Sequence, residues 1–175
     1  MPAKFIFTAL IALMLTACSE SGQDQTLTTP SAAEILASLQ SDSDPESTMY
    51  QTLSGQALDL NVFAGKKVFV NYWATWCAPC IREIPSINRA AEALESENYV
   101  FVLASDESQE TIAEFLEERQ FEGNFIKLND YFGAHGIHAV PSSLLLDEKG
   151  EVIRRWDGSF EWDSPEMLAQ LRVQD

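Results

Sequence analysis

The chain has 175 residues, enough for one domain of ordinary size, and 46% of them are apolar, so it can bury a core of its own. Its 27 Asp and Glu residues outnumber its 11 Lys and Arg residues, which gives a formal net charge of −16 at pH 7. Because an acidic surface repels the phosphates of nucleic acids, we expect no nucleic-acid partner.

The first segment has the pattern of an export signal. Lys4 supplies a positive start, and residues 5–15 (FIFTALIALML) form an apolar run that is too short for a helix spanning a bilayer, which needs about 20 residues. The next residues, LTAC at 15–18, resemble the lipobox of bacterial lipoproteins, in which the cysteine becomes the first mature residue and carries lipid. We therefore expect a signal peptide over 1–17 and a lipid anchor on Cys18. The alternative is an ordinary signal peptide cleaved nearby.

The segment 18–47 is rich in Ser, Thr, Gln and Asp, a composition typical of a flexible acidic tether. Within it, residues 31–40 can form a short amphipathic helix, because Ile35, Leu36 and Leu39 share a face. We expect the globular domain to cover 48–175.

Apolar patterning in this domain predicts alternating strands and helices. Asp106, with a glutamine three residues later, also has the spacing of a capping box for the second helix. This order predicts an α/β fold in which a mixed sheet carries helices on both faces. The expected elements are a hairpin at 53–60, a buried strand at 66–74, a helix from Cys77, a strand at 99–106, a helix over 111–121, a short strand at 125–130, a hairpin over 142–156 and a last helix opened by Ser164 and Pro165.

A close pair of cysteines, Cys77 and Cys80, stands in the segment WATWCAPCIREIP. Covalent haem attachment requires His directly after the second cysteine, where this chain has Ile81. A structural zinc site needs four ligands, and the other candidates, His135 and His138, lie more than fifty residues away and are expected to be loop residues. A disulfide that closes so short a loop adds little stability. Electron exchange is the remaining interpretation.

The expected local structure supports redox chemistry. A thiol at a helix N-terminus faces the positive end of the helix dipole, which favours the thiolate, so we expect Cys77 to be the exposed attacking thiol and Cys80 the shielded resolving thiol. If Cys18 carries lipid, these two cysteines form the one disulfide pair of an exported protein. Pro79 fixes the backbone between them. Trp76 is expected to flank the sulfur, with core packing as its alternative role.

The segment YWATWCAPCIREIP resembles the active-site segment of the thioredoxin superfamily, specifically its TlpA/ResA-type branch of exported thiol–disulfide oxidoreductases. Three further stretches carry the same resemblance, so that it covers about residues 50–173. They are LSGQALDL with GKKVFVNYWA, FIKLNDYFGAHGI, and HGIHAVPSSLLLDEKGEV.

The resemblance implies a thioredoxin fold with an N-terminal β-hairpin and a strand and helix inserted before a cis-proline segment. It makes Pro141 the cis-proline that faces the disulfide and Val140 a backbone contact for the substrate. This chain departs from the family at four places, where Tyr, Gly and a Thr pair are usual. The residues found there are His135, Ala139, Ser142 and Ser143.

Glu83 carries the assignment to this branch. Thioredoxins proper have a buried Asp at the position of Asn71, whereas the TlpA/ResA branch has a glutamate three residues after the second cysteine, which is Glu83 here. A carboxylate beneath a thiol raises the pKa of the thiol or accepts its proton. The alternative is a solvated helix residue paired with Arg82 or Lys67.

We therefore expect a membrane-tethered, extracytoplasmic enzyme that reduces protein disulfides through Cys77, Cys80 and Glu83, with no bound cofactor and no metal. The resemblance implies substrates such as the cysteines of apocytochrome c, and re-reduction by a membrane electron donor of the CcdA/DsbD type. The alternatives are an oxidase or isomerase of the same chemistry, and a non-catalytic lipoprotein that assists assembly or handles Cu(I) with His138 as an added ligand.

Overall fold

The computed structural model describes residues 32–38 and 48–172. The expected signal peptide, Cys18 and most of the expected tether lie outside the described residues. Among the described residues, no helix is long and apolar enough to cross a membrane.

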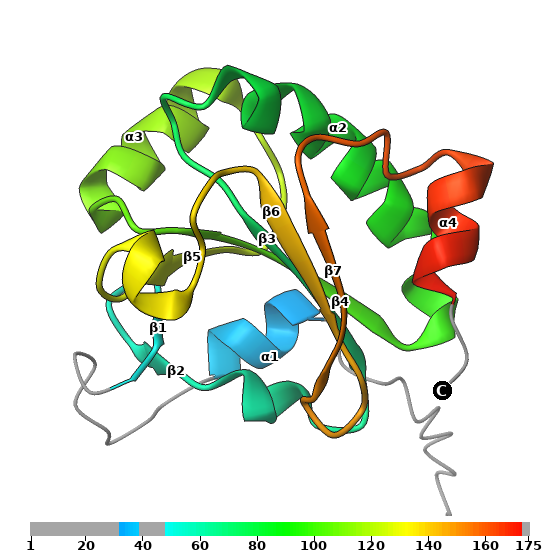
Figure 1. The fold of residues 1–175 in the computed structure, drawn as a ribbon. Helices are drawn as coiled ribbons and strands as arrows, with labels where there is room; N and C mark the ends of the chain where they lie inside the picture. The colour runs from blue at the N-terminus through cyan, green and yellow to red at the C-terminus, as the bar shows by residue number, and fades with distance from the viewer. Residues whose placement is uncertain (1–31, 39–47, 173–175) are drawn as a thin grey trace, which may run out of the picture.

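A seven-stranded mixed sheet forms the centre of the domain, in the order β2-β1-β5-β4-β3-β6-β7 (Figure 1). Strands β3, β4 and β5 run parallel, and the other pairs are antiparallel. The two central strands are buried along almost their whole length, as their continuous apolar runs predict. The strand bounds are β1 Tyr50–Thr52, β2 Ala57–Leu58, β3 Lys67–Tyr72, β4 Tyr99–Ser105, β5 Phe125–Leu128, β6 Ser142–Leu146 and β7 Val152–Asp157.

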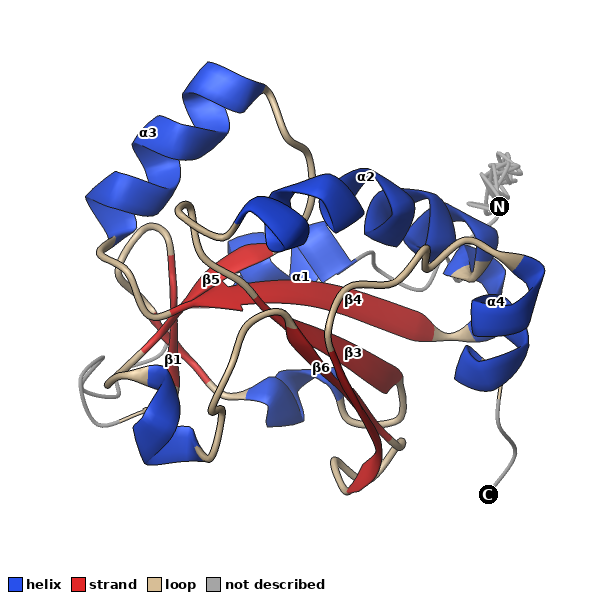
Figure 2. Ribbon diagram, turned by 45° about the horizontal axis from the view of Figure 1, so that its top comes forward, coloured by secondary structure: helices blue, strands red, loops and turns tan. Residues whose placement is uncertain are grey.

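Helices cover both faces of the sheet, which confirms the predicted layers. Figures 1 and 2 show α2, α3 and α4 together on one face, and Figure 1 shows α1 on the opposite face. The helices are α1 Ala32–Ser38, α2 Ala78–Ala93, α3 Gln109–Arg119 and α4 Pro165–Leu171, with short 3-10 helices η2 Leu60–Phe63, η3 Glu95–Glu97 and η4 Phe132–His135. The predicted amphipathic helix near the N-terminus is α1, and its Ile35 and Leu36 pack against the core. The segment that the resemblance places before the cis-proline forms β5 and η4.

Alternation along β3 divides the interior into two cores. Phe69 packs against α2 and α4 residues in one core, while Val68, Val70 and Tyr72 belong to the core on the opposite face. Successive side chains of a strand point to opposite faces, so Asn71 lies on the α2 side together with Phe69. The chemistry-bearing segment at the start of α2 therefore lies against one face of the sheet only.

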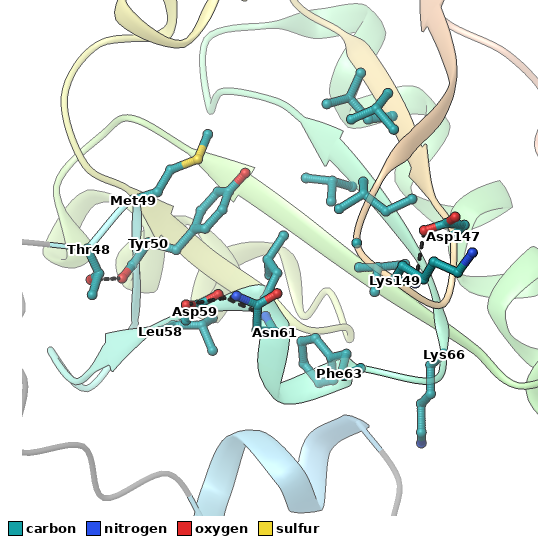
Figure 3. Close-up of a pocket in the computed structure, with 18 of the residues that line it drawn as sticks. Thr48, Met49, Tyr50, Leu58, Asp59, Asn61, Phe63, Lys66, Asp147 and Lys149 are labelled. Carbon is teal, nitrogen blue, oxygen red and sulfur yellow. Dashed lines mark hydrogen bonds between the residues drawn. The ribbon is translucent and has the colours of Figure 1, made fainter.

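The opposite face contains a cavity of about 490 Å³ with largely apolar walls, lined by η2, β3 and the β6–β7 hairpin. Figure 3 shows Tyr50 on one side of it and Asp147 and Lys149 on the other. The hydroxyl groups of Tyr50 and Tyr72 share a hydrogen bond of 2.8 Å. Burial raises the pKa of both phenols above their usual value, so both stay neutral. The sheet separates this cavity from the cysteine pair.

The predicted cap of α3 is wrong. The chain bends after β4 and the helix begins only at Gln109, so its N-cap is Ser108, whose hydroxyl accepts a hydrogen bond from Thr111 N at 3.2 Å. Asp106 instead accepts a hydrogen bond from Phe132 N at 3.0 Å. This bond ties the β4–α3 loop to η4.

Replacing Ser108 by Ala should lower the free energy of unfolding by about 1 kcal/mol, because the helix loses the acceptor for one of its unpaired N–H groups. Ser108→Thr, which keeps a hydroxyl at the same place, should cost clearly less. Urea unfolding of the two variants measures the difference. Equal losses for Ala and Thr would contradict this cap.

Candidate active site

The two cysteines form a disulfide at the start of α2, as the sequence predicts. Cys77 is the N-cap residue of the helix, and Pro79 stands in its first turn. The N–H of Cys80 donates a hydrogen bond to Cys77 Sγ at 3.3 Å. After reduction, the same N–H group and the helix N-terminus favour a thiolate on Cys77.

The two sulfurs differ less in exposure than the sequence predicts. Cys80 is fully buried, which confirms its shielding, but Cys77 is only 4% exposed, so the prediction of an exposed Cys77 is wrong for this disulfide form. The cause is the neighbouring loop, since the carbonyl oxygen of Val140 lies 3.7 Å from Cys77 Sγ.

The loop that covers Cys77 contains a cis peptide bond between Val140 and Pro141, as the resemblance implies. The carbonyl of Pro141 accepts a hydrogen bond from Gly158 N at 2.9 Å, and the hydroxyl of Ser142 donates to Asp157 at 2.9 Å. These two bonds attach the loop to the end of β7, and the backbone of Val140 lies beside the disulfide.

His138 is a loop residue, as expected, whereas the loop prediction is wrong for His135, which ends the 3-10 helix η4. His135 Nε2 lies 2.7 Å from the carbonyl oxygen of Asn129, and His138 is exposed. Within residues 32–38 and 48–172, no group of three or more His, Cys, Asp or Glu side chains is arranged to hold a metal ion.

Trp76 is 70% exposed, so its alternative role as a core residue is wrong and its indole is open to solvent next to Cys77. The loop that presents it is tied down by Glu107, which accepts hydrogen bonds of 2.7 Å from both the N–H and the hydroxyl of Thr75. Sequence reasoning missed Glu107. The available signal was its place just after β4, because the carboxyl ends of neighbouring parallel strands meet at one edge of the sheet.

Glu83 is buried, with 2% of its surface exposed, so the alternative of a solvated helix residue is wrong. Both carboxylate oxygens accept hydrogen bonds. Oε1 accepts from Asn71 Nδ2 at 2.9 Å, and Oε2 accepts from Phe160 N at 3.0 Å and from Trp162 Nε1 at 3.1 Å. These donors come from β3 and from the segment between β7 and α4.

Burial raises the pKa of Glu83 above its usual value, because the charged form loses its hydration. The hydrogen bonds from Phe160 N, Asn71, Trp162 and Ser159 lower the pKa and offset part of this effect. All of these groups are uncharged. The carboxyl group is therefore able to exchange a proton closer to neutral pH than an exposed glutamate.

Asn71, from which the sequence predicts no role, is hydrogen-bonded to the buried carboxyl group of Glu83. Its amide donates both hydrogens, to Glu83 and to Ser143 Oγ, each at 2.9 Å. Its Oδ1 is buried and has no hydrogen-bond partner in the described part of the chain. Turning the amide by half a rotation would offer Oδ1 to a protonated Glu83, so this residue can pair with both protonation states of the carboxyl.

The comparisons with known proteins show the family and the fold of this chain. The sequence profile of the AhpC/TSA family matches residues 42–171. The chain belongs to the AhpC/TSA family. A relative, the thiol-disulfide oxidoreductase ResA of Bacillus thuringiensis subsp. konkukian, is 30% identical over 109 residues, which is 61% of this chain and 63% of ResA. The match therefore spans less than two thirds of that relative, but it confirms the resemblance to ResA-type proteins.

Solved structures that are similar to this chain confirm its thioredoxin-like fold. StoA from Bacillus subtilis matches with a TM-score of 0.57 and 22% identity, covering 71% of the chain and 95% of StoA. A structure described as a putative thiol:disulfide interchange protein DsbE from Chlorobium tepidum matches with a TM-score of 0.59 and 21% identity, covering 70% and 89%.

The buried carboxyl should make stability depend on pH. Because the pKa of Glu83 is raised on folding, the folded protein binds more protons than the unfolded chain from about pH 4.5 upward, so its stability falls as pH rises toward the folded pKa. We expect wild type to lose up to about 1.4 kcal/mol per pH unit relative to Glu83→Gln across this window. Urea unfolding of the oxidised proteins at a series of pH values measures it.

The matched control is Glu97→Gln. Glu97 pairs with Arg172 at the surface, which lowers the pKa of Glu97, so any effect of this substitution should have the opposite sign. Parallel stability curves for wild type and Glu83→Gln would contradict the raised pKa of Glu83.

Proposed function

We propose that this chain is a thiol–disulfide oxidoreductase that acts on disulfides of other proteins. The observation that carries the proposal is the Cys77–Cys80 disulfide at a helix N-terminus, beside a cis-proline and one helical turn before a buried carboxyl group. The similarity to ResA supports the same activity.

In the reducing direction, the thiolate of Cys77 attacks one sulfur of a substrate disulfide. The substrate S–S bond breaks, its other sulfur leaves as a thiolate, and a mixed disulfide with Cys77 forms. The thiol of Cys80 then passes its proton to Glu83 and attacks Cys77 Sγ. This step releases the second substrate thiolate and forms the Cys77–Cys80 disulfide, so the protein is oxidised by two electrons and the substrate disulfide is reduced.

Two features beside the disulfide suit a protein substrate. The backbone of Val140 lies next to Cys77 Sγ and offers polar groups to an extended chain, in the manner of an added strand. The exposed indole of Trp76 offers an apolar surface on the neighbouring loop. We propose Val140 as the backbone contact of the substrate and Trp76 and Pro79 as supports of the reacting sulfur.

We further propose that the chain works outside the cytoplasm on a lipid anchor. The pattern of residues 1–17 and the cysteine at Cys18 support it, and the globular domain over 48–175 would then be joined to the membrane by the acidic segment 18–47. A reductase in an oxidising compartment needs a source of electrons. We propose a membrane donor of the CcdA/DsbD type as this source and the cysteines of apocytochrome c as the substrate.

The Cu(I) alternative gains no support from the described residues. Besides the two sulfurs, the nearby candidate ligand is His138, which is exposed and belongs to no cluster of metal-binding groups among them. Oxidase and isomerase functions use the same cysteine chemistry and differ from a reductase in the reduction potential of the pair.

Cysteine variants test the activity. Cys77→Ser should abolish the reduction of insulin disulfides, since it removes the attacking sulfur, while Cys80→Ser should accumulate mixed disulfides on Cys77 that gel electrophoresis without reductant detects. The double Ser variant is the control and should trap nothing. Full activity of Cys77→Ser would refute the proposal.

The reduction potential tests the direction. For a reductase we expect equilibration with glutathione to give a value near that of thioredoxin, about −270 mV, rather than near that of DsbA, about −120 mV. A value at the DsbA end would make the chain an oxidase.

A further inference from the structure

The segment between β7 and α4, residues 158–163, is bonded to α2 along four successive positions of one helix face. We call it the clamp segment. Spacings of three and four residues place these positions one above another on the helix. The bonds are Ser159 Oγ to the Pro79 carbonyl at 3.3 Å, Phe160 N to Glu83 at 3.0 Å, Trp162 N to Ser86 Oγ at 3.2 Å, and ion pairs of Arg89 with Glu161 and Asp163.

Trp162 is the largest side chain of the clamp segment, and it is completely buried. Its ring packs against Phe69 at 4.6 Å and against Trp156 and Phe160 at 5.4 Å each, measured between ring centroids. These neighbours fix the indole in one orientation. A buried indole N–H needs an acceptor, and the acceptor it has is Glu83 Oε2 at 3.1 Å.

The donors around Glu83 make its two oxygens unequal. Oε2 accepts two N–H groups, one from the Phe160 backbone and one from Trp162, so a proton on Oε2 would oppose both donors. Oε1 accepts a hydrogen bond from Asn71, whose Oδ1 has no partner among the described residues and can turn to receive a proton. A protonated Glu83 therefore carries its proton on Oε1.

We propose that Trp162 is a positioning residue for Glu83: its indole N–H holds Oε2 in place and thereby sets the pH range in which the carboxyl exchanges its proton. The proposal rests on the proposed function for its effect on thiol exchange. The contact between the two side chains does not depend on that function.

Among residues 32–38 and 48–172, the groups that interact with Glu83 are uncharged. They are Asn71 of β3, with Ser143 of β6 behind it, and Ser159, Phe160 N and Trp162 of the clamp segment. On α2 itself, Cys77 and Cys80 titrate only after reduction. Because the indole N–H stabilises the carboxylate, removing it raises the pKa of Glu83 further.

The first test needs no change at Trp162. In the oxidised protein, the indole ¹H–¹⁵N signal of Trp162 should shift with pH as Glu83 titrates, with a midpoint above 4.5, the usual value of a glutamate. The signal of Trp156 is the internal control, because its indole lies in the same ring cluster but donates to Gln170 at 3.0 Å. In Glu83→Gln the shift of Trp162 should vanish. A Trp162 signal that ignores pH, or that titrates unchanged in Glu83→Gln, overturns the inference.

The second test compares Trp162→Phe with Trp156→Phe, which remove one indole each from the same cluster. Reduced protein is mixed with 5,5′-dithiobis(2-nitrobenzoate) over a range of pH, and the midpoint of the rate profile is measured. Trp162→Phe should move the Glu83-dependent midpoint up by roughly one to two pH units, the effect of one lost hydrogen bond to a charged group. Trp156→Phe should leave the midpoint unchanged, and Trp162→Phe should have no effect in a Glu83→Gln background.

The outcomes separate the positioning role of Trp162 from the proton-transfer role of Glu83 in the proposed function. Equal shifts for both Phe variants overturn the positioning role, because packing would then explain them. If Trp162→Phe does not fold, the indole titration of the unmodified side chain decides. A Trp162 signal that follows Glu83, in a protein whose thiol exchange ignores Glu83→Gln, overturns the proton role in the proposed function and leaves the contact between Trp162 and Glu83 established.

Discussion

The burial of one carboxyl group, that of Glu83, is the constraint on which the rest of this site depends. An ionised carboxylate is costly to remove from water unless hydrogen-bond donors replace its hydration. Here the replacement comes from Asn71 on β3 and from Phe160 and Trp162 in the clamp segment. Strand β3 and the clamp segment must therefore both be in place before the carboxyl group has its hydrogen-bond donors, so the site exists only in the completed fold.

The cysteine pair and the carboxyl use different parts of α2. The pair occupies the first turn, where free N–H groups favour negative charge on Cys77, whereas Glu83 lies in the next turn, where the helix has no free N–H group to give. A charge at Glu83 must be supported from outside the helix, and the clamp segment provides this support. Its further bonds to Ser86 and Arg89 hold the two segments in register.

The sequence predicts the scaffold and the reacting atoms, and it fails where contacts between distant segments decide. Continuous apolar runs identify β3 and β4, and the spacing in WATWCAPC identifies the helix start and the disulfide. The sequence pattern predicts Asp106 as the cap of α3 in place of Ser108, because both residues suit a cap and only the bend after β4 selects between them. The exposure of Cys77 depends on a loop 63 residues away. Trp162, which is 79 residues from Glu83, leaves no pattern in the sequence that connects the two.

The carbonyl of Val140 over Cys77 Sγ has a consequence for which molecules the oxidised protein can meet. Attack on a disulfide must come in line with the S–S bond, and Cys77, which is only 4% exposed, offers small thiols in solution little room for that approach. A protein partner that lays its own backbone along Val140 gains contacts that a small molecule lacks, and these contacts can offset the opening of the loop. The shape of the partner at Val140, in addition to the reduction potential, then selects which dithiols reach this disulfide.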